Sequence, residues 1–226
     1  MRQIICGLII IGCVFVSSSA SAGFTTWFPS PNEPDLDEIL DNLYGLSNVV
    51  RVADTGGLTD QIWFNSNAAV SVEAKFSSRD HTFGYYQGLT GWSFNPLFTV
   101  SGSGYLSGVT GGFTPAQSGN PFRFADKTGW VPAWSSLELQ NLDFMDHMVT
   151  YQITGDDPTK SNTVGSYVLA WEDGSWFGDR DYNDLIVEVS GVGLGGCSPV
   201  PEPATLTLLG MGLVGFTGWS LRRRKK

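Results

Sequence analysis

Cysteine is scarce in this chain, which has three among its 226 residues. Cys6 and Cys13 lie in an apolar N-terminal stretch that we expect to be removed, so only Cys197 remains in the mature region. A single cysteine cannot form a disulfide within one chain, which excludes the class of small domains held together by disulfides. The fold must therefore rely on a hydrophobic core, and the chain is long enough to bury one.

Basic residues are also few: 13 lysines and arginines face 22 aspartates and glutamates, which gives a net charge of −9. Five of the basic residues form the C-terminal cluster 222–226, and residues 23–201 alone have 7 basic and 21 acidic residues, a net charge of −14. Because nucleic-acid backbones are bound by basic patches, this balance excludes nucleic acid as a partner. Cations are the expected partners of such a surface.

Only two histidines are present, His81 and His147, and neither belongs to an H-x-x-H or H-E-x-x-H pattern. A zinc site is therefore not expected, and His147 is expected to donate a hydrogen bond from a strand near the acidic loop described below. The chain lacks a G-x-S-x-G nucleophile elbow, because the spacing in Gly102-Ser103-Gly104 is wrong. A glycosidase needs two carboxylates at a defined separation, whereas the acidic residues here gather in one loop. An enzyme is the minority interpretation, and no catalytic residue is predicted.

Glycine is abundant, at 28 residues, and charged residues make up only 15% of the chain, a composition typical of an all-β extracellular domain. Apolar residues at helical spacing predict one short amphipathic helix over 35–44, which Gly45 ends. Turn residues separate nine candidate strands: Asn48–Ala53, Gln61–Phe64, Ala69–Phe76, Thr82–Tyr86, Leu97–Ser101, Pro121–Ala125, Met145–Thr154, Ser166–Glu172 and Asp184–Ser190. We predict a jelly-roll-like β-sandwich over residues 23–190, followed by a flexible Gly-rich linker over 191–199.

An acidic stretch lies between the last two predicted strands, with five carboxylates in thirteen residues and Arg180 as its only cation. A hard cation relieves such crowding, and calcium prefers carboxylate and amide oxygens. We therefore predict a calcium site with the ligands Glu172, Asp173, Asp179, Asp181, Asn183 and Asp184. The spacing excludes an EF-hand, because Asp184 and Ser190 stand where glycine and glutamate are needed. The alternative is a solvated hairpin loop whose Asp and Asn side chains cap their own turns.

The sequence around this loop resembles the C-terminal motif of the DUF4114 family of bacterial extracellular domains. The matching residues are Trp171-Glu172-Asp173, followed by Gly178-Asp179-Arg180-Asp181-Tyr182-Asn183-Asp184 and a hydrophobic run. Residues 146–151 resemble the histidine-containing strand that precedes the motif in that family. The resemblance implies a β-rich, calcium-linked domain at the cell surface or in an extracellular matrix.

The N-terminus has the three parts of a secretory signal peptide. Arg2 gives a positive start, residues 4–16 are apolar, and Ala20-Ser21-Ala22 forms a small-residue cleavage site. We predict that signal peptidase cuts after Ala22. The alternatives are a membrane anchor, for which the apolar run is short, and a lipoprotein processed at Cys13.

The C-terminus has three parts in order: Pro201-Glu202-Pro203, an 18-residue apolar run over 204–221, and the basic cluster 222–226. The apolar run is long enough for a transmembrane helix, and the basic cluster orients its end to the cytoplasm. Residues 200–226 resemble the PEP-CTERM sorting signal, which implies recognition by an exosortase-like enzyme and processing near the Pro-Glu-Pro motif. The alternative is a plain tail anchor.

Together these parts predict export across the inner membrane, a membrane-anchored precursor, and a mature form at the cell surface or in the exopolysaccharide matrix. The main alternative is a calcium-dependent, lectin-like module that binds extracellular polysaccharide through aromatic rings stacked on sugars. Trp176 and Phe177 are the candidates for such stacking because they lie in the acidic loop, whereas most other rings are expected in the core. A secreted glycan-active hydrolase is the third possibility.

Overall fold

The computed structural model describes residues 33–52, 60–113, 120–129, 132–160, 162–175 and 178–195. Several predictions fall outside these residues: the signal peptide with Ala20 and Ala22, the sorting signal with Pro201, Glu202 and Pro203, the membrane helix 204–221, Cys197, and the rings of Trp176 and Phe177. Within the described ranges, no helix is both long and apolar enough to cross a membrane.

The described strands form one eleven-stranded sheet, whose main path runs β1-β9-β10-β11-β2-β7-β3-β4. β5 and β6 pair with β2, β8 pairs with β7, and the pairings are antiparallel. The strands are β1 (Val49–Arg51), β2 (Trp63–Lys75), β3 (His81–Gln87), β4 (Phe94–Val100), β5 (Gly104–Tyr105), β6 (Thr110–Phe113), β7 (Phe122–Thr128), β8 (Trp134–Ser135), β9 (Met148–Ile153), β10 (Tyr167–Trp171) and β11 (Leu185–Leu194). Helix α1 (Leu36–Tyr44) and two 3-10 helices, Leu46–Asn48 and Glu138–Gln140, are the described helices. The prediction of an all-β fold with one short N-terminal helix is confirmed.

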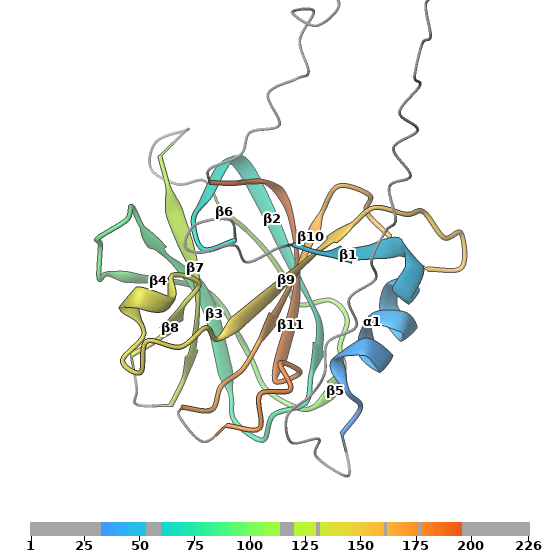
Figure 1. Cartoon of the computed structure of the whole chain (residues 1–226), viewed down its shortest axis with the longest axis horizontal. Coiled ribbons are helices and arrows are strands. Elements are labelled where there is room, and N and C mark those ends of the chain that lie inside the picture. The colour runs from blue at the N-terminus through green and yellow to red at the C-terminus, as the bar shows by residue number, and fades with distance from the viewer. Residues whose placement is uncertain are drawn as a thin grey trace, which may run out of the picture.

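The sheet folds over itself, so that its two halves pack as a sandwich around the main core (Figure 1). Val70 of β2 and Val187 of β11 share this core with Phe83 of β3 and Phe124 of β7. Phe83 meets Trp171 edge to face across the core, with ring centroids 6.3 Å apart. Trp63, Trp134 and Trp171 are all buried here, so these rings fill the core as predicted.

Helix α1 covers the other face of the sheet (Figure 1), and a second apolar cluster lies between them. The Asp35 side chain caps the helix by accepting a hydrogen bond from the Glu38 backbone N–H at 2.8 Å, a contact worth about 1 kcal/mol. The buried positions recur at helical spacing: Leu36, Ile39, Leu40 and Tyr44. Gly45 ends the helix with a φ of 78°, which favours glycine. The short amphipathic helix packs on the sheet as the sequence predicted.

Strand β2 unites two segments that the sequence predicted as separate strands, 61–64 and 69–76, and its long partner β11 runs to Leu194. The predicted start of the linker at residue 191 is therefore wrong, because residues 192–194 pair with residues 65–63 of β2. Gly191 lies where the register shifts, with a φ of 69°, and a Cβ there would be 2.0 Å from the Asn67 carbonyl oxygen. The glycine that suggested a linker is what lets the strand pass a bulge and remain paired. β5, β6 and β8 were not predicted.

Candidate functional site

The acidic loop (residues 172–184) connects β10 to β11, whose register places Trp171 opposite Leu185. Its two ends are therefore adjacent, as the sequence predicted. Two glycines bring the backbone onto the Glu172 carboxylate: a Cβ on Gly174 or on Gly178 would lie 2.6 Å from Glu172 Oε1. A side chain larger than glycine does not fit at either position, so the loop closes over this carboxylate.

Glu172 is buried beneath the loop, with 3% of the residue exposed. Its Oε1 accepts a hydrogen bond from the Gly174 backbone N–H at 2.8 Å, whereas Oε2 is buried without a hydrogen-bond partner among the described residues. Burial raises the pKa of Glu172 to about 7, and the charges of Asp179 and Asp181 add to this effect. A buried oxygen without a donor is uncommon in folded proteins and costs free energy. This oxygen is therefore available to a ligand.

Asp184 lies beside Glu172. Its Oδ2 accepts a hydrogen bond from the Asp173 backbone N–H at 2.6 Å. Burial and the charges of Asp173 and Glu172 raise the pKa of Asp184 to about 8. One carboxylate oxygen each from Glu172, Asp173 and Asp184 lies within 4.8 Å of the others, a spacing that suits a shared cation.

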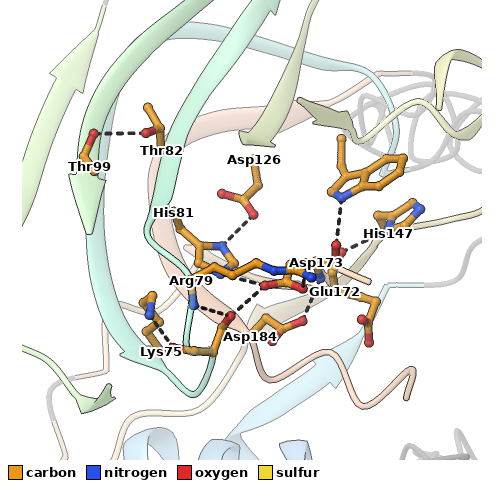
Figure 2. Close-up of polar contacts among 12 residues, drawn as sticks. Lys75, Arg79, His81, Thr82, Thr99, Asp126, His147, Glu172, Asp173 and Asp184 are labelled. Carbon is orange, nitrogen blue, oxygen red and sulfur yellow. Dashed lines mark hydrogen bonds and ion pairs between the residues drawn. The ribbon is translucent and has the colours of Figure 1, made fainter. Parts of the chain in front are cut away.

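Asp173 differs from its two neighbours because its carboxylate already has protein partners (Figure 2). Oδ1 accepts a hydrogen bond from Arg79 Nη1 at 2.8 Å, and Oδ2 accepts one from Ser77 Oγ at 2.6 Å. His81 Nε2 lies 3.3 Å from the same Oδ2. Burial acts to raise the pKa of Asp173, but His81, Ser77 and Arg79 outweigh it and lower that pKa. Among the predicted ligands in this group, Asp173 is the one whose charge the protein itself balances.

His81 extends this network into the core, where its Nδ1 lies 2.7 Å from Asp126 Oδ2 and neither side chain is exposed (Figure 2). Burial alone would lower the pKa of His81, but Asp126 and Asp173 raise it to about 9. His81 therefore lies buried between two carboxyl groups that favour its protonated form, while burial raises the pKa of Asp126 itself. The sequence did not indicate this role, because no local pattern links His81 to strand β7 or to the acidic loop.

His147 fixes the backbone at the start of the loop. Its Nδ1 donates a hydrogen bond to the Glu172 carbonyl at 3.0 Å, as predicted, although it lies just before β9 rather than within it. The His147 carbonyl accepts a hydrogen bond from the Glu172 N–H, also at 3.0 Å. The His147 ring stacks on Trp134 with centroids 3.9 Å apart. These contacts hold Glu172 in place without using its carboxylate.

A second acidic group forms at the other end of the loop, where one oxygen each from Glu33, Asp179 and Asp181 lies within 4.8 Å of the others. Asp181 is 2% exposed, and burial together with the charge of Asp179 raises its pKa to about 6. Asn183 Nδ2 donates a hydrogen bond to the Pro34 carbonyl at 2.9 Å, which holds the segment before α1 against the loop. No local pattern in the sequence indicated Glu33 as a member of this group. The predicted carboxylates therefore fall into two groups rather than one.

Two non-glycine residues in this part of the loop have left-handed backbone conformations: φ is 55° at Arg180 and 54° at Tyr182. Such conformations cost on the order of 1–3 kcal/mol each and persist only where the surroundings enforce them. Tyr182 is held by its buried ring and by a hydrogen bond from its hydroxyl to the Asp146 carbonyl at 3.0 Å.

Two family models match the chain. The model for DUF4114, a domain of unknown function, matches residues 108–192, and the model for the PEP-CTERM protein-sorting motif matches residues 199–224. The first span contains the whole acidic loop, and the second contains the Pro-Glu-Pro motif. Both resemblances stated from the sequence are confirmed. A search of curated proteins found no match.

Three solved bacterial lectins resemble the chain at low identity. The high-affinity mannose-binding lectin of Ralstonia solanacearum is 16% identical over 57% of this chain and 93% of that chain, with a TM-score of 0.33. The Chromobacterium violaceum lectin CV2L, in complex with alpha-methyl-fucoside, is 15% identical over 57% and 94%, with a TM-score of 0.33. The C-terminal domain of the BC2L-C lectin from Burkholderia cenocepacia is 18% identical over 58% and 95%, with a TM-score of 0.34. A likeness this distant carries no argument about ligands.

Proposed function

Because the chain carries a DUF4114 segment and a PEP-CTERM sorting motif, we propose that it is an exported structural or interaction protein with a calcium-binding β-sandwich, held at the cell surface or in an exopolysaccharide matrix. The sorting motif indicates export and a membrane-anchored precursor that is sorted to the cell surface. We further propose that the domain binds calcium, that the mature protein resides in the matrix, and that an exosortase-like enzyme processes the C-terminal tail. Signal peptidase acts on the precursor first.

One observation carries the calcium proposal: Glu172 Oε2 is buried, has no donor among the described residues, and belongs to the group with Asp184. Calcium takes six to eight oxygen ligands in flexible geometry. A site made of carboxylates and loop carbonyls therefore suits calcium better than it suits other common metals. Glu172 and Asp184 would supply charge, and Asp173 would hold Asp184 through its backbone N–H. Burial and the repulsion between neighbouring carboxylates raise the pKa values of Glu172 and Asp184, and a cation here would offset both effects.

Isothermal titration calorimetry of the exported domain (residues 23–199) with calcium tests this proposal. We expect binding in the range of about 10⁻⁴ to 10⁻³ M, which is typical of extracellular calcium modules. Glu172→Gln should weaken binding at least about tenfold, because a neutral amide replaces a charged ligand. Glu138→Gln, in the 3-10 helix Glu138–Gln140, is the matched control and should bind like the wild type. No heat and no bound calcium in the wild type would remove the calcium proposal.

The sorting proposal has its own test. Replacing Pro201, Glu202 and Pro203 with alanine in the natural host should leave an unprocessed precursor in the membrane fraction. The mutant precursor should keep the mass of its C-terminal tail, whereas the wild type should be cut near the motif. Release and trimming of the mutant at the wild-type rate would favour a plain tail anchor or an unrelated protease.

The export step predicts a mature N-terminus at Gly23, because Ala20 and Ala22 satisfy the cleavage rule. N-terminal sequencing of the exported chain checks this prediction. A lipid-modified N-terminus at Cys13 would show a lipoprotein instead.

Calcium-dependent carbohydrate binding is the second candidate function, and one observation favours it. Trp92, in the turn between β3 and β4, is 68% exposed, and an exposed indole is a suitable platform for a sugar face. A glycan array probed with and without calcium checks this candidate. If Trp92 stacks on the sugar, Trp92→Ala should abolish the calcium-dependent glycan signal. Release of reducing sugar from the same glycans would instead reveal a hydrolase.

A further inference from the structure

A pocket of about 460 Å³ lies on the face of the sheet that carries α1, away from the acidic loop. Its walls come from the end of α1, from β2, from β11 and from the connection between β9 and β10. The volume is within the usual range of small-molecule sites, about 300–1,000 Å³. The side chains at the pocket are mainly polar: Tyr44, Ser71, Glu73, Lys160, Thr163 and Glu188. A hydrophilic ligand fits this lining better than an apolar one.

Two carboxylates face this pocket from neighbouring strands. Glu188 of β11 pairs with Ser71 of β2, so Glu73, two residues further along β2, is a diagonal neighbour on the same face. Glu188 is only 9% exposed. Burial raises the pKa of Glu188 and the charge of Glu73 adds to the rise, although the nearby hydroxyls of Thr163, Ser166 and Tyr44 act against it. Two like charges in a half-enclosed space favour a positive ligand between them.

The Tyr44 hydroxyl supplies a second, independent indication of a ligand. Tyr44 is 2% exposed, and its hydroxyl lies near the Glu188 carboxylate but makes no bond in hydrogen-bonding geometry. Burial raises the pKa of Tyr44 strongly, and the charges of Glu73 and Glu188 raise it further. The phenol therefore keeps its proton and has both a donor and an acceptor to offer. A buried hydroxyl without a partner is uncommon, and a polar ligand would satisfy it.

Lys160 is the one cation among the residues that line the pocket, and it is engaged elsewhere. Its Nζ donates hydrogen bonds to the carbonyls of Asn42 at 2.7 Å and of Asp41 at 3.1 Å. These carbonyls belong to the last turn of α1, where a cation is favoured. The positive charge of Lys160 thus lies at the helix end, and among the described residues neither Glu73 nor Glu188 forms an ion pair with it within 4.0 Å.

We propose that this pocket binds a small hydrophilic molecule that carries a protonated amine, with the amine between Glu73 and Glu188 and a hydroxyl group of the ligand at Tyr44. An amine satisfies this geometry because it donates several hydrogen bonds to carboxylates while compensating both charges. A neutral polyol would fill the same space without relieving the repulsion. The proposal does not depend on calcium, because none of the residues at the pocket belongs to the acidic loop.

The test compares two sugars that have the same ring but differ in charge: glucosamine, whose amine is protonated near neutral pH, and N-acetylglucosamine, whose nitrogen is a neutral amide. The full chain, purified in a detergent without a sugar headgroup, is titrated with each by calorimetry. We expect glucosamine to bind at least about tenfold more tightly than N-acetylglucosamine, since hydrogen bonds to charged groups are the stronger class. Glu188→Gln should remove this preference.

Two further variants keep the test decisive. Tyr44→Phe removes only the hydroxyl and should weaken glucosamine binding several-fold, and a melting temperature close to that of the wild type shows that the variant remains folded. Glu138→Gln is remote from the pocket and should bind like the wild type. Equal binding of the two sugars, absence of binding in a folded wild type, or a preference that survives Glu188→Gln would each overturn the proposal.

Discussion

The two sides of the acidic loop differ in how their negative charge is balanced. On the side that faces His81, which we call the inner side, Asp173 and Asp126 share His81, and Asp173 also binds Arg79. On the opposite side, which we call the outer side, Glu172 and Asp184 have backbone N–H donors, and Glu172 Oε2 has no donor among the described residues. The pKa of Asp173 is accordingly lowered, whereas burial raises the pKa values of Glu172 and Asp184. One side is therefore complete as folded, whereas the other has a buried carboxylate oxygen without a donor among the described residues, where we propose that a cation binds.

The largest expected effect comes from breaking the inner side. His81→Ala leaves Asp126 and Asp173 buried without their shared partner, and removing one partner of a buried ion pair typically costs about 3–5 kcal/mol. The pKa of His81 is raised to about 9 in the folded chain. The contribution of protonated His81 to the free energy of unfolding is therefore complete below its ordinary pKa and is lost as the pH rises through about 9. Urea unfolding of residues 23–199 at neutral and alkaline pH measures both effects.

Thr82→Ala is the matched control for His81→Ala, because Thr82 lies on the same strand and its hydroxyl meets the Thr99 hydroxyl at 3.0 Å on the surface (Figure 2). It should change the free energy of unfolding by less than about 1 kcal/mol. Equal stability of the His81→Ala variant and the control would show that the buried pair does not hold the inner side together.

The second prediction sets the two sides against each other in calcium-free buffer. Asp173→Asn weakens the charge-assisted hydrogen bonds from Arg79 and Ser77 and removes the ion pair with His81, so it should lower the free energy of unfolding by about 1–3 kcal/mol. Glu172→Gln keeps an oxygen for the Gly174 N–H and removes a buried charge, so it should leave stability unchanged or raise it. Parallel thermal melts in EDTA compare the two. If Glu172→Gln destabilises as much as Asp173→Asn, then the Glu172 carboxylate is already compensated and the comparison fails.

The third prediction concerns pH. Asp181, Glu172 and Asp184 have pKa values raised to about 6, 7 and 8, so the calcium-free folded state holds more protons than the unfolded state between about pH 4 and 8. Their contribution to stability is complete below their ordinary pKa values and is lost as the pH rises through 6 to 8. Calcium competes with these protons, so stabilisation by calcium should grow over the same range. Melts with and without calcium at several pH values check this, and a calcium effect independent of pH would contradict it.

The sequence predicted those features that depend on neighbours along the chain. Apolar residues at helical spacing before Gly45 predicted α1, and the carboxylates between two strand patterns predicted the acidic loop. It could not show that Ser77 meets Asp173 across 96 residues, or that Pro34 meets Asn183 across 149. Partners of this kind are set by strand pairing and leave no periodic signal. For the same reason, the predicted ligand set included Asp173, whose carboxylate already has protein partners, and did not include Glu33.

A thermal melt of residues 23–199 in EDTA and in millimolar calcium tests the central claim most directly. At ten times the dissociation constant, a ligand specific for the folded state stabilises it by about 1.4 kcal/mol, which should raise the melting temperature by roughly 3–6 °C. Glu172→Gln and Asp181→Ala, one from each acidic group, should together abolish the shift, while Glu138→Ala should leave it intact. Identical melts of the wild type in both buffers, or a shift that survives both substitutions, would contradict a calcium site in the acidic loop.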